Sequence, residues 1–576
     1  MRLQIIKSKN AESFYVVKST YINKKRSSCI VEKLGTLNDV KVKAGNSDPY
    51  QWAMNYAKKL TELEKNNQGS VIIEKIRNKQ LENNKQTLFN GGYLFLEKIY
   101  YELGLQNICT EISNKYNFKY DLNNILSRLI YGRVLSPSSK LATLDYSNTL
   151  LEKPNFDIQH IYRALEVISK NMNFIQSELY KNSKKVISRN SNILYYDCTN
   201  YFFEIEQEDE LRKYGKSKEN RPTPIVQMGL FLDGNGIPLA FNINPGNTNE
   251  QITLKPLEEQ IINDFEYSKF VVCTDAGLSS IANRKFNNKS NRSFITTQSV
   301  KKLKQHIKDK AIDLTTGWKL PNKDKTYNIS NLRTDEDMIK KYKDVVFYKT
   351  IPINENNLEQ NLIITYSAKY QEYQRKIRNN QIERAKKLIE NNPKKIGKAK
   401  QNDSKRFIKT TQITKDGEVA ENTIHSIDLS VIENEAQYDG IYAVCTNLND
   451  SVEDIIKINS RRWEIEESFR IMKTEFKSRP VFLSREDRIK AHFTTCFLAL
   501  MVYRVLESKM NSEFSAEKII QTLRDMNFLE ISKEGFIPSY TRTEITDKIH
   551  EISGFRTDYE IVTNKQLKKI FKDIKK

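Results

Sequence analysis

The stretch from residue 192 to residue 275 constrains the fold of this chain more than any other part of its sequence. "NILYYDC" has the apolar and aromatic composition of a buried strand, and "IVQMGLFLDGNGIPLAFNINPG" predicts two strands joined by a turn at Asp233-Gly234-Asn235-Gly236. Thr248, with Gln251 three residues later, resembles a capping box that opens a helix, and "KFVVCTD" predicts a further strand. The order is therefore a strand, a hairpin, a helix and another strand.

Two aspartates stand on the outer strands of this order, Asp197 inside the first and Asp275 at the end of the fourth. The order itself is that with which an RNase H-like fold begins, and in such a fold the fourth strand lies parallel beside the first. We therefore expect the two aspartates on adjacent central strands of one sheet. A carboxylate inside an apolar strand must be paired, hydrogen-bonded or bound to a cation.

A third carboxylate is expected from a helix predicted around residues 458–476. At about 100° per residue, Glu466 lies beside Arg462 and Lys473 at the edge of the apolar face. That face consists of Ile465, Phe469, Met472 and Phe476, and the glutamates on the far side are Glu464, Glu467 and Glu475. An ordinary salt bridge between Arg462 and Glu466, which are four residues apart, accounts for the same pattern.

Taken together, Asp197, Asp275 and Glu466 are candidates for a catalytic metal site. Divalent cations such as Mg²⁺ prefer oxygen ligands and keep waters for a substrate. Two such ions, roughly 4 Å apart, activate a water or a 3′-hydroxyl and stabilise the leaving oxygen in phosphodiester cleavage and transfer. Arg462 and Lys473 would hold neighbouring phosphates. The hypothesis is therefore that Asp197 binds a metal ion.

A chain of 576 residues is too long for one ordinary core, and its sequence divides into six parts. Short strands and a helix are predicted in 1–90, and several helices in 91–188. The aspartates belong to 189–290, a polar segment rich in Lys and Asn follows in 291–437, and the core resumes in 438–510 with the helix of Glu466. Residues 511–576 form a basic C-terminal region. The expected fold class is multidomain α+β.

The charge of the chain points to a polyanionic partner. Its formal net charge is +21 and its pI about 9.3, which favours nucleic acid. Residues 371–410 hold thirteen Lys or Arg against four Asp or Glu. A generally Lys- and Asn-rich proteome is the alternative explanation of the net charge, and a solvated charged helix or loop is the alternative explanation of the cluster.

Other classes of protein lack support in the sequence. Six cysteines and five histidines are dispersed, which argues against a disulfide framework and a local zinc site. The N-terminus lacks the apolar segment of a signal peptide, and the run "CFLALMVY" is shorter than a membrane span of about 20 residues. No phosphate-loop GK[ST] pattern predicts an ATP site. We expect a cytoplasmic protein with reduced thiols.

Several motifs of the chain belong together. "YYDCTNYFFE" and "VVCTDAGLSS" contain the two aspartates, and the other blocks are "YGKSKENRPTPIVQMGL", "PGNTNE", "YDGIYAVCTN", "IEESFRIMK" and "SRPVF". In order and spacing they resemble the insertion-sequence transposases of the DDE, RNase H-like class, in the branch with a Tyr-x2-Arg-x3-Glu-x6-Lys signature. Arg462, Glu466 and Lys473 match that signature, whereas Asn459 stands at its Tyr position. The resemblance covers most of 90–510.

The resemblance implies cut-and-paste DNA transposition by a prokaryotic, nucleoid-associated enzyme. It implies an RNase H-like catalytic core, a mixed sheet flanked by helices, that holds two Mg²⁺ ions, for which Mn²⁺ may substitute. Water would cleave one strand at each element end, and the freed 3′-hydroxyl would form a hairpin that is reopened before the ends join target DNA. Because Asn459 replaces the tyrosine, the hairpin step does not follow from the signature.

The same resemblance assigns roles to the other parts. The large insertion at 291–437 would contain strands and an aromatic residue that stacks on a flipped base, and Trp318 is its tryptophan. The helices of 91–188 would form an N-terminal DNA-binding region that recognises the terminal inverted repeats. Partners would be those repeats, target DNA and a second copy of the chain, on paired ends, with no membrane and no ATP.

Two alternatives remain open at this point. An RNase H-like nuclease, such as a junction resolvase without strand transfer, needs the same three carboxylates. A catalytically inactive transposase derivative that only binds DNA needs none of them, although all three are present.

Overall fold

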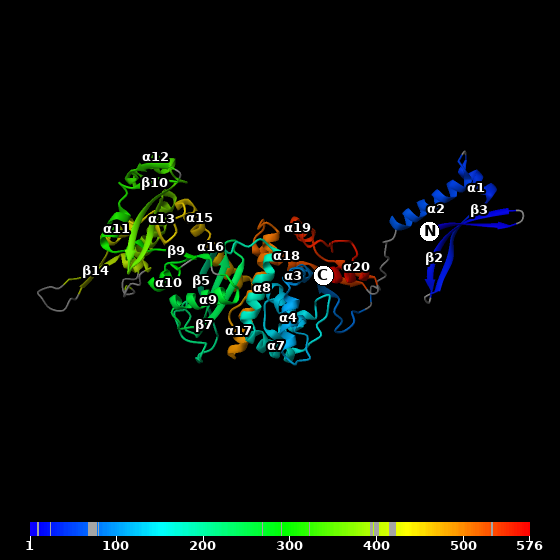
Figure 1. Ribbon diagram of the computed structural model, residues 1–576, viewed down its shortest axis with the longest axis horizontal. Helices are drawn as coiled ribbons and strands as arrows, with labels where there is room; N and C mark the ends of the chain where they lie inside the picture. The colour runs from blue at the N-terminus through cyan, green and yellow to red at the C-terminus, as the bar shows by residue number, and fades with distance from the viewer. Residues whose placement is uncertain are drawn as a thin grey trace. The chain divides into compact units, whose positions relative to one another are not determined.

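The computed structural model describes residues 1–576 except 9–10, 23–24, 46, 67–77, 79, 268, 290, 322, 392–395, 397–401, 414–421 and 532–533. The chain divides into two compact units, Met1–Lys85 and Gln86–Lys576 (Figure 1).

The first unit is an antiparallel sheet with two helices. Its elements are β1 (Arg2–Ser8), β2 (Ala11–Ile22), β3 (Lys25–Thr36), α1 (Leu37–Ala44) and α2 (Pro49–Asn66), with β2 in the centre of the sheet. Phe14 and Val16, two residues apart on β2, are buried with Val40 of α1 and Ala53 of α2. Because side chains alternate along a strand, this spacing buries one face of the sheet. The unit thus has a core of its own.

The second unit opens with β4 (Leu88–Asn90) and a helical region. Its helices are α3 (Tyr93–Glu102), α4 (Leu105–Lys115), α5 (Leu122–Leu135), α6 (Lys140–Ser147), α7 (Ile158–Lys170) and α8 (Met172–Val186). Pro137 lies in the turn between α5 and α6.

Helices α3, α5 and α7 pack against α17 (Glu486–Lys509), which contains the apolar run noted in the sequence. Among the described helices, α17 is the one long and apolar enough to cross a membrane by length and composition, and 94% of its most apolar window is buried inside the protein. A helix that is apolar on all sides is typical of a large core.

Within the described residues, ten strands form one sheet, in the order β11-β10-β12-β13-β16-β9-β8-β5-β6-β7 (Figure 1). Its last five strands are β5 (Ile193–Phe202), β6 (Ile225–Asp233), β7 (Pro238–Pro245), β8 (Phe270–Thr274) and β9 (Arg292–Thr297). The hairpin partners β6 and β7 run antiparallel beside β5, whereas β8 pairs in parallel with both β5 and β9. The expected parallel pairing of the first and fourth strands is confirmed.

Helices cover both faces of this part of the sheet. On one face α9 (Glu250–Asp264) and α8 share a buried cluster with Tyr196 and Phe231, and on the other face Tyr201 packs on α17. The start of α9 differs in detail from the expectation, because its N-cap is Asn249, whose side chain accepts a hydrogen bond from the Gln251 amide, and not Thr248.

The segment 291–437 extends the same sheet. Its strands β10 (Trp318–Leu320), β11 (Lys323–Tyr327), β12 (Val346–Glu355) and β13 (Leu358–Ser367) join the core through β16 (Ile441–Thr446), which pairs with β13 on one side and β9 on the other. The segment also contains the helices α11 (Gln305–Ile312), α12 (Glu336–Lys341), α13 (Ala368–Asn391) and α14 (Leu429–Ala436). Its strands β14 (Ile408–Ile413) and β15 (Asn422–Ile427) form a hairpin. Helix α10 (Ile281–Phe286) precedes the segment and lies between β8 and β9 in the chain.

The helix predicted around 458–476 is interrupted in the structure. Helix α15 (Val452–Ser460) ends two residues before Arg462, α16 spans Trp463–Arg470, and Ile471–Glu475 form a π-helical turn. A wider turn changes the rotation per residue. The assumption of one regular helix was therefore wrong.

The described residues of the C-terminal region form helices and strands. It contains α18 (Ala516–Asp525), β17 (Asn527–Ile531), β18 (Gly535–Pro538), α19 (Glu544–Ser553) and α20 (Asn564–Ile574). Strands β18 and β17 form a small sheet with β4. The basic end of the chain is an amphipathic helix, α20, which buries Leu567, Ile570 and Ile574.

Candidate active site

Strand β5 turns three consecutive same-face side chains toward the segment that contains Glu466. The Tyr195 hydroxyl donates to the carbonyl of Ile458 at 2.9 Å, and the Lys473 ammonium donates to Thr199 Oγ1 at 2.5 Å. Asp197 lies between Tyr195 and Thr199 and, two residues from each, faces the same way. The segment from 458 to 473 therefore runs over the face that carries Asp197.

The register of the parallel pair brings the two aspartates together. Tyr195 of β5 stands opposite Cys273 of β8, and two further residues along each strand lie Asp197 and Asp275. Adjacent strands are about 4.8 Å apart. The charge of Asp275 also raises the pKa of Asp197.

The pKa of Asp197 is raised in the folded protein. Burial is the main cause that raises its pKa from 3.8 to about 6. The Lys218 ammonium lowers the pKa in opposition, and so do the Cys198 amide, which donates to Asp197 Oδ1 at 2.8 Å, and Arg462. Burial and the charge of Asp275 together outweigh these partners, so the charged form of Asp197 is less favourable here than in water.

Asp275 begins the loop that follows β8. Its Oδ1 accepts the backbone amides of Gly277 at 2.9 Å and of Leu278 at 3.1 Å. This side-chain turn holds the carboxylate at the carboxyl end of its strand.

Glu466 lies at the edge of this group, not inside it. Its side chain is 68% exposed and stands 3.9 Å from Arg462 Nη2, the i,i+4 pair that the sequence suggested. Arg462 Nη1 also donates to Thr297 Oγ1 on β9 at 2.9 Å. Glu466 is nevertheless the exposed one of the four glutamates in this segment, because Glu464 and Glu475 are buried and Glu467 is half-buried.

Glu464 and Glu475 are buried, although the helical projection placed them on the side away from the apolar face. Glu464 accepts two hydrogen bonds from Arg461 and packs on the hairpin turn at Gly236, where a Cβ would collide with its carboxylate. Gly236 has φ +77°, a conformation that favours glycine. Glutamates placed on the far side of the helix thus face the protein.

Lys473 lies on the same side of β5 as Asp197. Burial lowers its pKa from 10.5 to about 8, the nearby Lys218 lowers it further, and Asp197 acts in the opposite direction. Lys218 comes from the loop before β6, donates to the Cys198 carbonyl and ion-pairs with Glu250 at 3.5 Å. Lys218 belongs to the "YGKSKENRP" block, but it was not among the site residues predicted from the sequence.

The residues present fit a divalent cation in part. Two carboxylates from adjacent strands supply oxygen ligands, and a bound cation would favour the charged form of Asp197, which burial opposes. Across the described part of the chain, however, no group of three or more His, Cys, Asp and Glu side chains is placed to hold a metal ion. The structure brings Asp197 and Asp275 together and leaves Glu466 with Arg462.

Asn459, at the Tyr position of the signature, contacts a tyrosine from elsewhere in the chain. Its Nδ2 donates to the Tyr442 hydroxyl at 3.1 Å, and that hydroxyl lies 2.6 Å from Thr297 Oγ1, the same oxygen that receives Arg462. Tyr442 of β16 is thereby linked to Arg462 through Thr297. The "YDGIYAVCTN" block contains this tyrosine, but its sequence position gave no sign of the contact.

The assignment of Trp318 to a base-stacking role is corrected. Its side chain is 0% exposed, its Nε1 donates to the Asp313 carbonyl at 2.9 Å, and its ring packs edge-on against Tyr366 and under the Lys349 ammonium. A ring with no exposed face cannot receive a base. The exposed tryptophan is Trp463, 58% exposed and next to Arg462.

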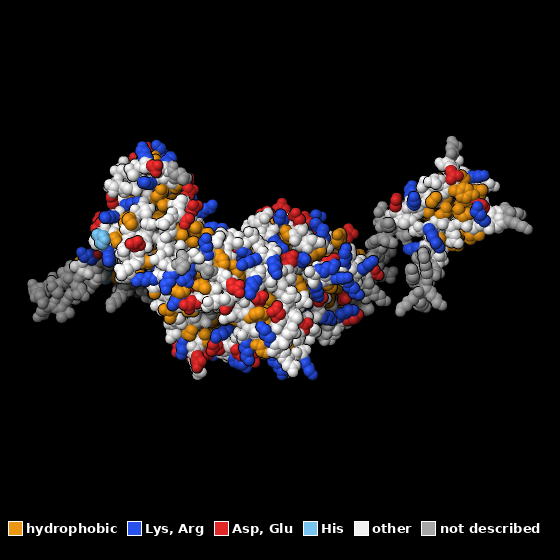
Figure 2. All heavy atoms as spheres, viewed as in Figure 1, with side chains coloured by type: hydrophobic (Ala, Val, Ile, Leu, Met, Phe, Trp, Pro, Cys, Tyr) orange, Lys and Arg blue, Asp and Glu red, His pale blue; other side chains and the backbone are white. Residues whose placement is uncertain are grey.

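The basic cluster at 371–410 is only partly available to a partner. Arg378 is buried in a bidentate pair with Asp439, and Arg406 bonds to Glu435 and Gln381. Lys394, Lys395, Lys398 and Lys400 lie outside the described residues. On the face seen in Figure 2, Lys and Arg are spread among Asp and Glu.

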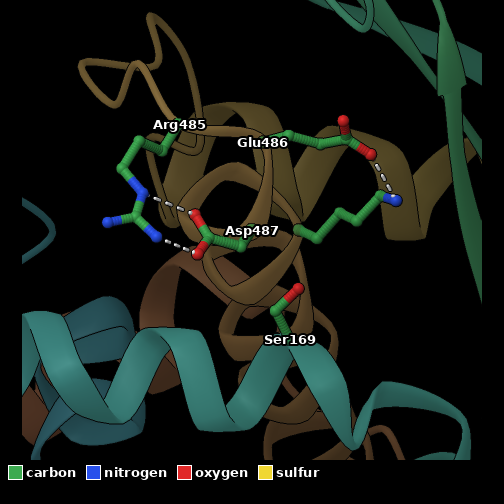
Figure 3. Close-up of a pocket in the computed structure, with 5 residues that line it drawn as sticks. Ser169, Arg485, Glu486 and Asp487 are labelled. Carbon is green, nitrogen blue, oxygen red and sulfur yellow. Dashed lines mark hydrogen bonds and ion pairs between the residues drawn. The ribbon is translucent and has the colours of Figure 1, made fainter.

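One surface hollow near the start of α17 has balanced charges (Figure 3). It measures about 390 Å³, and within it Arg485 pairs with Asp487 at 2.6 Å and Lys490 with Glu486 at 2.6 Å. Since each cation already has a carboxylate, the hollow has no net charge to offer a ligand.

Comparison with known proteins gives one family. The family model described as "Transposase DDE domain" matches residues 202–502, more than half of the chain, a range that includes Asp275, Glu466 and Lys473 and begins within the strand of Asp197. No curated protein matches. The cryo-EM structure of piggyBac transposase synaptic complex with hairpin DNA is similar at 9% identity and a TM-score of 0.36, over 85% of this chain and 86% of that one.

Proposed function

Because this chain belongs to the Transposase DDE domain family, we propose that it moves an insertion sequence by cut-and-paste, using Asp197, Asp275 and Glu466 as its catalytic carboxylates. Membership in the family makes it a transposase, an enzyme that cleaves and joins DNA. The observation that carries the assignment of residues is the parallel register of β5 and β8, which places Asp197 level with Asp275 on the face crossed by the Glu466 segment.

The strand arrangement supports an RNase H-like core. In chain order the five strands stand as 3-2-1-4-5, with the first three antiparallel and the last two parallel to the first. The spacing of Arg462, Glu466 and Lys473 supports the branch with the Tyr-x2-Arg-x3-Glu-x6-Lys signature.

In this proposal Asp197, Asp275 and Glu466 hold two divalent ions, Mg²⁺ or Mn²⁺. Bound there, the ions would activate the attacking water or 3′-hydroxyl and stabilise the leaving oxygen. The repulsion between Asp197 and Asp275 gives the pair its affinity for cations, and the Arg462–Glu466 pair must open for Glu466 to join them.

The basic residues of the site bind DNA phosphates. Arg462 is held toward β9 by Thr297, and Lys473 is held over β5 by Thr199, so both cations are positioned before DNA arrives. Tyr442 steadies Arg462 through Thr297 and reaches Asn459, the position where the signature has tyrosine. A hairpin step therefore remains compatible with Asn459 in this proposal.

We further propose double-stranded DNA as the partner, both as terminal inverted repeats and as target, with helices α3 to α8 as the region that recognises the ends. A homodimer on paired ends, independence from ATP and a nucleoid location complete the proposal. The net charge of +21 supports a nucleic-acid partner.

The test begins with the genomic DNA that flanks the reading frame. Short inverted repeats bordered by a target duplication identify the ends, and a labelled end is then incubated with purified protein and Mg²⁺ or Mn²⁺. Cleaved and joined products are expected. If pre-cleaved ends are never joined to target DNA while uncut ends are cut, the protein is a nuclease without strand transfer, and binding without any product identifies an inactive derivative.

A further inference from the structure

A second cavity lies apart from the aspartates, between the α5–α6 turn, the segment after the π-helical turn, and α17. It measures about 360 Å³. Its lining includes Arg133, Lys140, Lys477, Arg479, Phe482 and His492. The lining contains four Lys or Arg side chains and no Asp or Glu.

Two of these cations are buried without a carboxylate partner. Lys140 and Arg133 are each 5% exposed. Arg133 donates to the carbonyls of Phe476 at 3.2 Å and Ser138 at 3.4 Å, while its Nε is buried without a hydrogen-bond partner. Among the described residues no carboxylate lies within ion-pair distance of either side chain.

The other buried arginines among the described residues of the second unit have carboxylate partners. Arg189 meets Asp233 at 2.7 Å, and Arg378 meets Asp439 at 2.5 Å. A buried charge without a partner destabilises the folded state, since desolvation is not repaid by an opposite charge. Among the buried arginines that the structure describes, Arg133 is thus the exception, and the partner it lacks is an anion.

The pKa values of Lys140 and His492 are both lowered in this cavity. Burial, followed by Arg133, lowers the pKa of Lys140 from 10.5 to about 7. Burial lowers the pKa of His492, and Arg133 and Lys140 lower it further, so this histidine stays neutral and adds no charge. In both groups burial is the larger cause, and the neighbouring cations add to it.

We propose that this cavity binds a backbone phosphate of DNA. Arg133 supplies a permanent charge, and an anion bound beside Lys140 would favour the charged form of that lysine. Lys140 is also the first residue of α6, so the positive end of that helix faces the same space. Arg479 already ion-pairs with Glu219 and serves as a rim residue. That the phosphate belongs to DNA, and not to a free anion, rests on the proposed function.

The mouth of the cavity favours a nucleic acid over a small anion. Phe482 is 74% exposed there, an apolar ring beside a cationic pocket. Aromatic rings next to phosphate-binding cations are typical of surfaces that hold unpaired nucleotides, because the ring stacks on a base while the cation holds the backbone. Phe482 would so hold a nucleotide whose phosphate enters the cavity.

The experiment compares the full-length protein with Lys140→Met, Phe482→Ala and a matched control, Lys170→Met, which removes an exposed lysine at the end of α7. Thermal unfolding is measured with and without inorganic phosphate, and binding of a labelled DNA duplex with a single-stranded overhang is measured across salt concentrations. Lys140→Met removes an unpaired buried charge, so it should fold at least as well as the wild type.

Inorganic phosphate should raise the unfolding temperature of the wild type and of Lys170→Met but not of Lys140→Met. DNA affinity should fall on the order of tenfold in Lys140→Met, with a salt slope smaller by about 0.9. Phe482→Ala should weaken DNA binding while keeping the response to phosphate.

Two results would overturn the proposed DNA-phosphate site, and a third would overturn the role of Phe482. A phosphate response lost in Lys140→Met with unchanged DNA affinity means a free-anion site. An equal response in Lys140→Met and wild type means that the cavity binds no phosphate. An unchanged DNA affinity in Phe482→Ala removes the nucleotide contact. These binding results do not depend on cleavage or joining, so failure of the proposed function in a strand-transfer assay is a separate outcome.

Discussion

Replacing Asp197 by asparagine should stabilise the metal-free protein at neutral and alkaline pH. Asparagine keeps an oxygen for the Cys198 amide, which donates to Asp197 Oδ1 at 2.8 Å. It removes the charge that burial and Asp275 oppose. A residue held for catalysis at a cost in stability is expected to behave in this way.

The size of the expected stabilisation follows from the pKa of Asp197. A rise from 3.8 to about 6 is roughly two units, and each unit corresponds to about 1.36 kcal/mol. Because Asp197 is only partly buried in the structure, we discount the sum to about 2 kcal/mol. The sign follows from the raised pKa: the folded state binds the proton more tightly, so stability is lost as pH rises from about 4 to about 6.

Urea unfolding at pH 8 and near pH 4.5 checks this prediction. Asp197→Asn should exceed the wild type by about 2 kcal/mol at pH 8, and the difference should shrink toward zero as pH falls to 4. Mn²⁺ should stabilise the wild type and so reduce the difference in the free energy of unfolding between it and the variant. Asp145→Asn, at an exposed position on α6, should show neither effect. An Asp197→Asn variant that is less stable than the wild type at pH 8 would refute the reasoning.

Three further predictions concern tryptophans and charge. Trp318→Ala should lower the free energy of unfolding by about 3–5 kcal/mol, because the ring is part of a packed core; a stable variant with a selective loss of DNA binding would restore the base-stacking role. Trp463→Ala should change stability by less than about 0.5 kcal/mol but weaken binding of element ends, since its exposed ring lies beside Arg462; unchanged affinity in a gel-shift titration speaks against it. DNA affinity should fall steeply with salt, at about −0.9 in the log–log slope per neutralised phosphate, and a nearly flat slope would remove DNA phosphate as the partner of the basic residues.

The central strands could be predicted because local signals fix them. Alternating burial, the Asp233–Gly236 turn and the helix before "KFVVCTD" determine the order of β5 to β8. The parallel register then follows from the fold that this order resembles. The aspartates were found because a carboxylate in an apolar strand requires a reason.

The details of the Glu466 segment could not be predicted from periodicity. A break before Arg462 and a π-helical turn at Ile471–Glu475 both change the rotation, and tertiary packing of Glu464 on the hairpin at Gly236 overrides its expected exposure. Such contacts join residues far apart in sequence, and a helical projection does not contain them.

The same limit applies to isolated residues. Trp318 stands between polar residues and glycine in the sequence, yet β10 places it in the core of the extended sheet. Lys140 stands just after a serine-rich turn that predicts exposure, and α17 and the segment after the π-helical turn bury it. Burial of a polar residue depends on which elements pack over it.

The identity of the third carboxylate is the most direct test of this account, because the structure leaves Glu466 beside Arg462 and away from Asp197. Glu466→Gln and Glu467→Gln, neighbours on α16, would be given a labelled element end with Mg²⁺ or Mn²⁺, and nicked, hairpin and joined products would be counted. Glu467 bonds to Arg470 through both carboxylate oxygens, so it serves as a control on the same helix. The account predicts that Glu466→Gln loses cleavage and strand transfer by about a thousandfold while still binding ends, and that Glu467→Gln keeps most activity. An active Glu466→Gln beside an inactive Glu467→Gln would contradict it.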